Sequence, residues 1–473
     1  MSGASVVPSP THAREAVVRP RRPKAAPRWW RRGAWALLWT LLLVVVALWV
    51  SNGGIPLLRT PAGALTSTGR LCGLVASCLM LVQVLLMARL PFVERSFGQD
   101  ELARRHRLVG FTSFSLMWAH VLLIWLGYAA ATRQGVWSTI VDLVLDYPGI
   151  LLAVAATVAL CLVVVTSVRA ARARLRYESW HLLHLYAYLG VGLALPHQLW
   201  NGQEFVGSIA ATVFWWGLWG AAVAAIVAFR VGMPLYRTAR HRVRVTEVYP
   251  EAPGVTTVVM SGRHLARLPA AAGQFFHWRF LGSPGSSRAH PYSLSEAPDG
   301  HTLRITAAHI GDGSAALATL QAGSRVVLEG PYGRLHGGVR TRPKVALLAS
   351  GIGITPIRAL LEDLPQRPGD VTLVYRAHSV HHVLFADELA ALAEARGARI
   401  LTVLGPRVAA RPSWLPQSAA HLSDAVALAH LVPDIAQHDV FICGNPKWTA
   451  LVADAARANG TPEAHLHIER FTY

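Results

Sequence analysis

Long apolar runs dominate the first half of the chain. Six stretches of about 20 mostly apolar residues occur at roughly 34–51, 70–90, 107–129, 148–168, 181–200 and 207–231. A helix of that length crosses the hydrocarbon core of a bilayer. The pattern therefore predicts an all-α membrane domain, a six-helix bundle over residues 34–232.

The pattern changes after residue 232, where short β-branched runs separated by Gly and Pro turns begin. Residues 240–338 are typical of a small antiparallel β-barrel. Residues 342–473 alternate buried strands with helical patterns, which favours an α/β nucleotide-binding domain. The predicted fold is thus a membrane helix bundle followed by two soluble domains.

Composition supports the membrane assignment. The chain has 473 residues, of which 53% are hydrophobic, and its mean hydropathy is +0.35, which is too high for an ordinary soluble protein. The net charge is +19. The basic residues gather in segment 1–33, in the second and fourth connections and after the sixth run, whereas the other connections hold Arg59, Arg70 and Arg133.

This charge distribution follows the positive-inside rule. It predicts a multi-pass protein of the cell membrane with both termini cytoplasmic, and it disfavours nucleic-acid binding. Segment 1–33, rich in Pro and Arg, is expected to be a disordered tail rather than a cleaved signal peptide. The four cysteines include no C-x-x-C pair, so neither a disulfide framework nor an iron–sulfur cluster is indicated.

Two membrane segments carry histidines at matching spacing. His106 and His120 lie fourteen residues apart in the third run, which corresponds to about 21 Å along a helix. His184 and His197 lie thirteen residues, or about 20 Å, apart in the fifth run. Because these two helices run in the same direction, His106 should face His184 and His120 should face His197. The pattern predicts two bis-histidine haem sites stacked across the membrane.

The pairing leaves alternatives open. On an ideal helix His197 is about 140° out of phase with His184, and we expect Pro196 to supply the necessary distortion. His181 competes with His184 as the inner ligand. A single histidine at membrane depth is also explained by a helix–helix hydrogen bond.

Motifs in the soluble half suggest an electron source. His290, Pro291, Tyr292 and Ser293 place a ring, a hydroxyl and a cationisable group on one extended segment, which suits a flavin. Downstream, three small residues precede a helix-like run, where backbone N–H groups can hold phosphates; these are Gly311, Gly313 and Ser314.

The last domain begins with a nucleotide-binding pattern. A buried strand leads into a turn with two glycines and an amphipathic helix; the residues concerned are Gly351, Gly353, Thr355 and Pro356. The next strand ends in Arg376, which favours the 2′-phosphate of NADPH over the bare ribose of NADH. A later strand ends in Cys443 and Gly444, and a cysteine there is equally explained as a small buried hydrophobe.

Taken together, these motifs resemble the ferric reductase and NADPH oxidase superfamily. The segment "HPYS" resembles the flavin motif of ferredoxin-NADP reductase-type modules, "GIGITP" resembles their glycine loop, and "CGNP" resembles their nicotinamide-side loop. The first half resembles the ferric reductase-like transmembrane domain. The resemblance covers nearly the whole chain after residue 33.

The resemblance implies an NAD(P)H-dependent transmembrane oxidoreductase with FAD and two b-type haems. By this resemblance Cys443 lies near the nicotinamide, and Phe471 or Tyr473 covers the flavin. Arg70, expected at the outer start of the second helix, would help to bind a small acceptor or a haem propionate. The acceptor is left open between molecular oxygen and chelated ferric iron. The alternatives are an electron-transfer subunit for a membrane protein partner and a non-catalytic haem-binding protein.

Overall fold

The computed structural model describes residues 29–172, 174–175, 177–202, 205, 207–282, 288–365 and 367–470. The chain separates into two compact units, and the division falls between Val231 and Gly232. Below, the membrane unit is the described part of 26–231. The reductase unit is the described part of 232–473. Phe471 and Tyr473 lie outside the described residues, so their expected place over the flavin stays a prediction.

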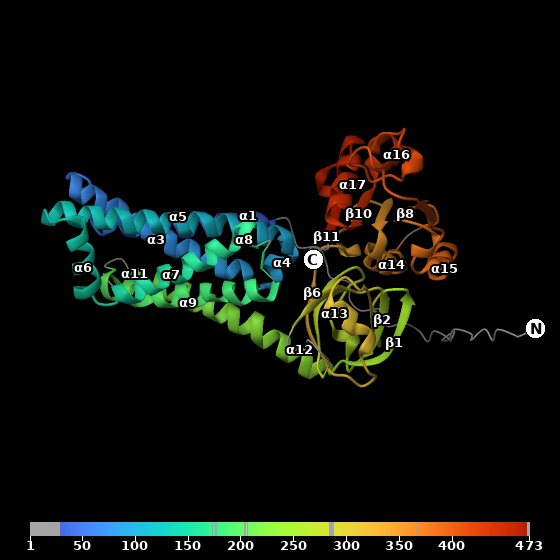
Figure 1. The fold of residues 1–473 in the computed structure, drawn as a ribbon, viewed down its shortest axis with the longest axis horizontal. Helices are drawn as coiled ribbons and strands as arrows, with labels where there is room; N and C mark the ends of the chain where they lie inside the picture. Colours follow the sequence, from blue (N-terminus) through green and yellow to red (C-terminus); the bar gives the residue numbers. More distant parts are fainter. Residues whose placement is uncertain are drawn as a thin grey trace, which may run out of the picture. The chain divides into compact units, whose positions relative to one another are not determined.

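The membrane unit is helical (Figure 1). Its long helices are α1 (Trp29–Ser51), α3 (Pro61–Met87), α5 (Gln99–Thr132), α7 (Ile150–Ser167), α9 (Tyr177–Asn201) and α11 (Ile209–Ala225). Shorter helices join them: α2 (Gly54–Leu57), α4 (Pro91–Phe97), α6 (Val136–Asp146) and α8 (Arg169–Arg172). A π-helical turn, Ile226–Gly232, follows α11 and leads to α12 (Met233–His241) in the reductase unit.

Five helices in the described residues are long and apolar enough to cross a membrane: Trp29–Ser51, Pro61–Met87, Glu101–Thr132, Ile150–Ser167 and Ile209–His241. The fifth predicted span forms helix α9, which is not among these five because its histidines and other polar residues lower its hydropathy. The structure therefore supports a helical, membrane-type region. A sixth crossing stays a prediction.

The second predicted span begins earlier than its apolar run. Helix α3 starts at Pro61, where Thr60 caps it by accepting a hydrogen bond from the Gly63 N–H at 3.2 Å. Proline suits this first position because its missing N–H would have no helical partner there. Arg70 therefore lies inside α3 rather than at its start, which corrects the expected position.

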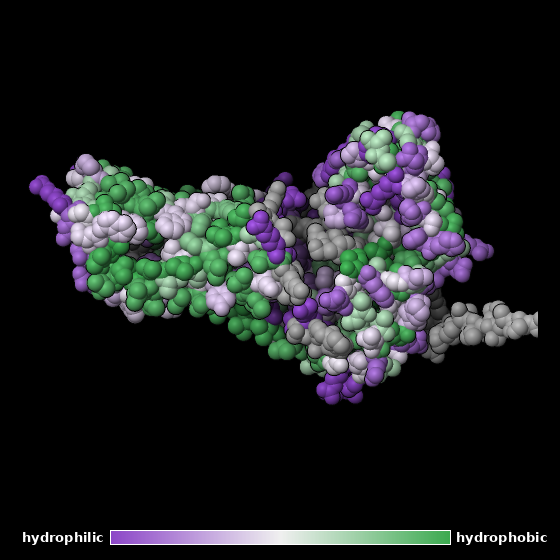
Figure 2. All heavy atoms as spheres, in the orientation of Figure 1, coloured by the Kyte–Doolittle hydropathy of each residue, from purple (hydrophilic) through white to green (hydrophobic). Residues whose placement is uncertain are grey.

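Helices α3 and α5 pack along one another, as do α7 and α9. The core between the helices contains Trp215, Leu218 and the buried Cys78. Large apolar side chains also cover the outside of the helices (Figure 2), among them Leu43, Val158 and Ile209. An apolar exterior over an apolar core is what a bilayer favours, since lipid rather than water surrounds such a surface.

The first part of the reductase unit, here called the flavin lobe, consists of six antiparallel strands in two sheets, ordered β1-β2-β5 and β4-β3-β6. An apolar core that includes Phe276 and Trp278 lies between them. The strands and the short helix of this lobe are β1 (Arg244–Ala252), β2 (Val255–Ser261), β3 (Phe275–Phe280), β4 (His290–Ser293), β5 (Thr302–Ala308), β6 (Val326–Tyr332) and α13 (Asp312–Ala315).

The second part, here called the nucleotide lobe, is an α/β fold with a parallel sheet ordered β11-β10-β7-β8-β9. The first strand, β7, lies in the middle, so the chain changes direction of winding between β7 and β10. Its elements are β7 (Val345–Ser350), α14 (Ile354–Asp363), β8 (Val371–Ala377), α15 (Ala386–Arg396), β9 (Arg399–Leu404), α16 (Asp424–Leu431), β10 (Asp439–Gly444), α17 (Pro446–Ala458) and β11 (Leu466–Arg470).

Candidate functional site

The two histidines of α5 are oriented by backbone carbonyls of α3. Nδ1 of His120 lies 2.9 Å from the Gly69 oxygen, and Nδ1 of His106 lies 3.3 Å from the Gln83 oxygen. Gly69 and Gln83 are fourteen residues apart, the same separation as the two histidines. A carbonyl accepts hydrogen bonds and cannot donate them. Both rings therefore carry their proton on Nδ1 and leave Nε2 free to bind a metal.

Close packing of α3 on α5 at the His120 level depends on glycine. A Cβ atom added at Gly73 would come 2.6 Å from His120 Nδ1, and one added at Gly69 would come 3.1 Å from the Leu123 side chain. The first distance is shorter than any ordinary contact. Gly73 therefore leaves the space that the His120 ring occupies.

At one level of the bundle, His106 of α5 faces His184 of α9. The ring centroids are 5.9 Å apart and the planes meet at 66°. Ser167 of α7 lies behind His184, with 3.3 Å between its Oγ and His184 Nδ1, and it accepts a hydrogen bond from Trp180 Nε1, also at 3.3 Å. This geometry favours His184 over His181 as the partner of His106.

At the other level of the bundle, His197 of α9 lies near His120 of α5. Nδ1 of His197 is buried and has no hydrogen bond of ordinary geometry in the described part of the chain, although the ring interacts with the Ala194 backbone. Pro196 lies inside α9, and the helix continues through it to Asn201. This nitrogen, unlike Nδ1 of His106 and His120, has no firm carbonyl partner that fixes its proton.

The paired histidines fit a haem better than a bare metal ion. Among the described residues, no group of three or more His, Cys, Asp or Glu side chains is arranged to hold a metal. A porphyrin supplies the four equatorial ligands itself, so two imidazoles are sufficient protein ligands. Two pairs of histidines at two levels agree with this requirement.

Arg70 of α3 follows directly after Gly69, whose carbonyl contacts His120. Its Nη2 donates to the Asn52 carbonyl at 3.4 Å. Asn52 lies in the turn after α1. This contact orients a cation beside the His120 level of the unit.

The predicted flavin segment forms strand β4, which pairs antiparallel with β3. Trp278 Nε1 donates to the Tyr292 carbonyl at 3.0 Å, which holds the segment to the lobe's core. The Oγ atom of Ser293 is buried without a hydrogen-bond partner among the described residues. That unsatisfied hydroxyl fits a bound flavin edge, because buried polar groups are normally hydrogen-bonded.

His290 and Tyr292 point the same way, as their rings stack with centroids 6.1 Å apart. A Cβ atom at Gly313 would come 2.3 Å from the His290 ring, so the glycine permits α13 to approach this strand. Ser314 accepts hydrogen bonds from the Ile310 and Gly311 N–H groups at 2.9 and 3.1 Å. Its hydroxyl thus shapes the turn that the sequence suggested as a phosphate site.

The predicted nucleotide motifs meet at one edge of the parallel sheet. Gly351 and Gly353 follow β7, and Cys443 and Gly444 end the adjacent strand β10. A Cβ atom at Gly353 would come 2.3 Å from the Cys443 oxygen, so the two loops touch. This is the carboxyl edge at the point where the winding reverses, which is where doubly wound sheets bind nucleotides.

At the start of α14, the Thr355 hydroxyl donates to the Ile352 carbonyl at 2.9 Å, and Pro356 completes the first turn. Cys443 is fully buried, and burial raises the pKa of its thiol well above the usual range. The side chain is therefore a neutral thiol at physiological pH rather than a reactive thiolate.

Arg376 does not project from the edge as the sequence suggested. It is buried, and its guanidinium donates to the carbonyls of Val403 at 3.2 Å, Gly405 at 2.6 Å and Trp414 at 3.3 Å, and also to that of Ala377. With these donors engaged, the side chain ties β8 to the loop after β9. This arrangement disfavours the expected contact with a 2′-phosphate.

Sequence reasoning missed the residues that orient the histidines. Gln83 and Gly69 act through backbone carbonyls, which no side-chain motif reveals, and Ser167 is an ordinary residue near a helix end. Gly69 and Gln83 are fourteen residues apart in α3, as His106 and His120 are in α5. This equal spacing was the one feature of the sequence that could have indicated the two carbonyls.

Comparisons with known proteins agree with both halves. Residues 72–195 match the family model of the ferric reductase like transmembrane component, and residues 347–454 match the oxidoreductase NAD-binding domain. The chain is 30% identical over 239 residues to ferredoxin–NADP reductase B of Sorangium cellulosum, covering 48% of this chain and 96% of that protein.

It is also 32% identical over 239 residues to the ferredoxin reductase component of a 3-ketosteroid-9-alpha-monooxygenase from Mycolicibacterium smegmatis, covering 48% of this chain and 63% of that protein. The chain thus spans less than two thirds of this second relative. Among solved structures, it is similar to the flavohem-like FAD/NAD-binding domain of a nitric oxide dioxygenase from Vibrio cholerae, with 25% identity and a TM-score of 0.38. The match covers 49% of this chain and 98% of that chain.

These matches define an NAD(P)H-dependent oxidoreductase with a membrane domain. The chain belongs to the ferredoxin-NADP reductase family, whose modules bind FAD and NAD(P)H. Its match to the ferric reductase like transmembrane component gives it the same arrangement of domains as fused ferric reductase and NADPH oxidase-like proteins.

Proposed function

We propose that this protein moves electrons from cytoplasmic NAD(P)H across the membrane to a small acceptor on the outer side, either molecular oxygen or chelated ferric iron. The observation that carries the proposal is the two-level pairing of histidines in a chain that also contains a reductase unit of the ferredoxin-NADP reductase type. When bound, FAD takes a hydride from the nicotinamide and b-type haems carry single electrons.

His106 and His184 would hold the inner haem, and His120 and His197 the outer one. Support comes from the 5.9 Å separation of the inner rings and from the carbonyls that fix the proton on Nδ1 of both α5 histidines. Fixing that proton keeps Nε2 unprotonated and correctly aimed. Partners of this kind strengthen metal binding about 10- to 100-fold.

In the reductase unit, Tyr292 would lie along the flavin ring, and Ser293 would donate or accept a hydrogen bond at its edge. His290 would place positive charge near the phosphates, and Gly311, Gly313 and Ser314 would shape the turn beside them. Gly351, Gly353, Thr355 and Pro356 would cradle the nucleotide phosphates. Cys443 and Gly444 would border the nicotinamide and help to exclude water from it.

Arg70 would hold an anionic acceptor or a haem propionate near the outer site, because its guanidinium lies on α3 next to the residue that orients His120. The basic connections support a cytoplasmic location for the reductase unit by the positive-inside rule. This orientation would send electrons outward.

A second candidate function is delivery of electrons to a protein partner. It is favoured by the names of the relatives, which are ferredoxin reductases and reductase components of oxygenases. A purified sample that reduces its haems with NADPH but passes electrons to neither oxygen nor ferric chelates would favour this alternative.

The test of the haem assignment is the haem content of the detergent-purified protein and of single-histidine variants. We expect about two haems per chain in the parent protein and about one in His120→Ala or His197→Ala, because the two levels use separate ligands. FAD reduction by NADPH should persist in both variants. Loss of both haems from either change would contradict two separate sites, and a parent protein without haem would contradict the proposed function.

A further inference from the structure

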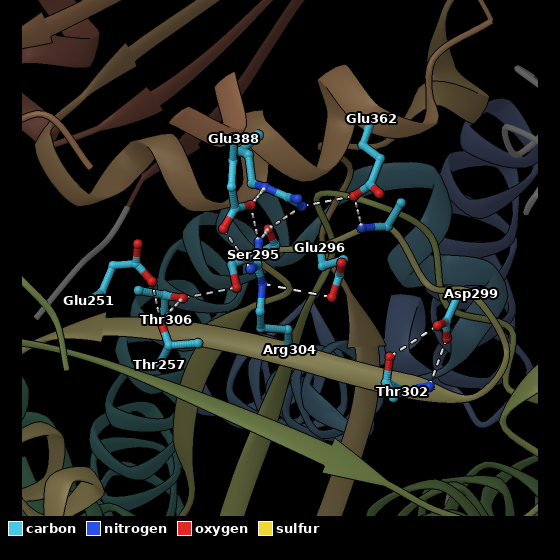
Figure 3. A network of polar contacts seen from close by, with 12 residues as sticks. Glu251, Thr257, Ser295, Glu296, Asp299, Thr302, Arg304, Thr306, Glu362 and Glu388 are labelled. Atoms are coloured by element: carbon cyan, nitrogen blue, oxygen red, sulfur yellow. Dashed lines mark hydrogen bonds and ion pairs between the residues drawn. The ribbon is translucent and has the colours of Figure 1, made fainter. Parts of the chain in front are cut away.

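A polar network joins the flavin lobe to the nucleotide lobe (Figure 3). Its centre consists of Arg304 on β5, Arg358 on α14 and Glu388 on α15, of which Figure 3 labels Arg304 and Glu388. Arg304 donates to both carboxylate oxygens of Glu388, at 2.9 and 2.8 Å. Bidentate pairs of this kind fix the relative orientation of their two partners as well as attracting them.

Both arginines also converge on the chain that continues from the flavin segment. Arg304 Nη2 and Arg358 Nη1 donate to the Ser295 carbonyl, at 3.3 and 3.0 Å. Ser295 lies two residues after Ser293, the end of strand β4, and is fully buried. One carbonyl is thus held by one arginine from each lobe.

A second contact between the lobes lies one helical turn further along α14. Glu362 accepts hydrogen bonds from the Ala297 N–H at 3.0 Å and from Arg358 Nη1 at 2.8 Å. Arg358 Nε also lies 2.6 Å from Glu388 Oε2, which connects the two contacts. The segment from Ser295 to Ala297 is therefore bound to α14 at two points.

Burial makes this arrangement rigid. The side chains of Arg304 and Arg358 are 8% and 6% exposed, and their charges are balanced by Glu362, Glu388 and the more distant Glu296 at 3.8 Å from Arg304. Separating one partner from a buried ion pair leaves an uncompensated charge, which is energetically costly. The two arginines and their carboxylate partners therefore stay in contact. Although burial alone would raise it, the pKa of Glu388 is lowered by the hydrogen bonds and charges of Arg304 and Arg358.

The network connects the strand that carries the predicted flavin residues to the helix that follows the glycine loop. Helix α14 begins immediately after the glycine loop at Gly351 to Gly353, and β4 carries the flavin residues. Hydride transfer requires reacting atoms about 3 to 3.5 Å apart, and a displacement of about 1 Å costs up to about 100-fold in rate. The position of α14 relative to β4 therefore matters for the reaction.

We propose that Arg304, Arg358 and Glu388 are positioning residues that set the approach of the nicotinamide to the flavin. They act through the Ser295–Ala297 segment and α14, and they touch neither reacting group. This inference rests on flavin reduction by NAD(P)H and is independent of the haem assignment, because flavin reduction precedes electron transfer across the membrane.

The test uses the full-length, FAD-loaded protein in detergent, mixed anaerobically with NADPH while the loss of flavin absorbance is followed. Glu388→Gln keeps the size of the side chain and removes its charge. We expect the rate constant at saturating NADPH to fall at least about tenfold, with the half-saturating NADPH concentration changed less than about threefold and FAD content retained. Glu388→Asp, which keeps the charge, should recover part of the rate.

Arg304→Lys is the second variant, since it keeps the charge but loses bidentate geometry, and it serves if Glu388→Gln does not fold. The double variant Arg304→Gln with Glu388→Gln should reduce its flavin about as slowly as each of the single variants Arg304→Gln and Glu388→Gln. Each single variant already breaks the contact between the two side chains. The matched control is Arg457→Gln, which removes an exposed ion pair with Glu463 in the same lobe and should leave the rate unchanged. Variants that transfer hydride at the parent rate per bound FAD, even with a lower melting temperature, would overturn the proposal and leave the network a purely stabilising role.

Discussion

His120 Nδ1 lies 2.9 Å from the carbonyl oxygen of Gly69, and Gly73, one turn further along the same helix, leaves the space for the ring. A helix without histidine thus determines the orientation of a proposed haem ligand on its neighbour. The same helix orients His106 through Gln83. Helix α3 is therefore part of both candidate haem sites.

Replacing Gly73 with alanine should disturb the outer site. The new Cβ would come 2.6 Å from His120 Nδ1, so the ring or the helix must move. We expect haem affinity at the outer site to fall about 10- to 100-fold, measured as haem content after purification. Gly192→Ala in α9 is the matched control, because nothing lies within 4 Å of the added Cβ. Full haem content in Gly73→Ala would contradict the role given to this glycine.

His184 and His181 are distinguished by their surroundings. His184 faces His106 at 5.9 Å and has Ser167 behind it. We predict that His184→Ala empties the inner site and abolishes outer haem reduction by NADPH, whereas His181→Ala retains both haems. Visible spectra of the two variants check this prediction. The opposite result would make His181 the ligand.

Arg376→Gln should affect stability rather than the choice of nucleotide. The buried guanidinium donates to several carbonyls, and hydrogen bonds of a charged group contribute about 1.5 to 3 kcal/mol. We expect a loss of roughly 3 kcal/mol in the free energy of unfolding, seen as a lower melting temperature. The Michaelis constants for NADPH and NADH should change by similar factors. A rise confined to NADPH would restore the 2′-phosphate contact that the sequence suggested.

Asp439 should give the reductase unit acid sensitivity. The side chain is fully buried, and burial alone would raise the pKa of its carboxyl. Hydrogen bonds outweigh this effect and hold the pKa far below its usual range. The donors are His467, His465 and the N–H groups of Thr341 and Arg342. A carboxyl whose pKa is lower in the folded state stabilises the fold above its unfolded pKa of about 3.9, and this contribution declines as the pH falls below that value.

The variant Asp439→Asn removes this contribution. We expect it to cost about 2 to 3 kcal/mol at neutral pH, with a smaller further loss between about pH 4 and pH 2 than the parent shows. Calorimetric unfolding across this range measures both effects. The surface variant Asp454→Asn is the control, since its partner Arg457 is exposed. Parallel pH profiles for Asp439→Asn and the parent would remove Asp439 from the account of acid sensitivity.

Much of the architecture follows from the sequence because apolar run length and strand periodicity act locally. The apolar runs correspond to helices, and "HPYS" and "GIGITP" correspond to β4 and to the β7–α14 turn. The early start of α3 and the burial of Arg376 were not foreseen, because a cap at Thr60 and carbonyls from distant loops determine them.

The facing of His106 and His184 was predicted, but the contacts between the two lobes and the backbone partners of the histidines were not. Arg304 and Glu388 are 84 positions apart and belong to different lobes, and neither lies in a motif. Gly69 and Gln83 contribute only their backbone to the histidines, and every residue has a carbonyl. Such partners are determined by how the elements pack. Hydrophobic periodicity indicates which face of an element is buried, but not which atoms meet there.

The most direct test of the central claim is an anaerobic visible spectrum of the detergent-purified, FAD-loaded protein before and after NADPH is added. We expect the flavin absorbance to be lost and reduced-haem bands then to appear, because electrons reach the paired histidine sites from the reductase unit. Air admitted afterwards should reoxidise the haems if oxygen is the acceptor. Haems that stay oxidised while the flavin is fully reduced would contradict electron transfer between the two units.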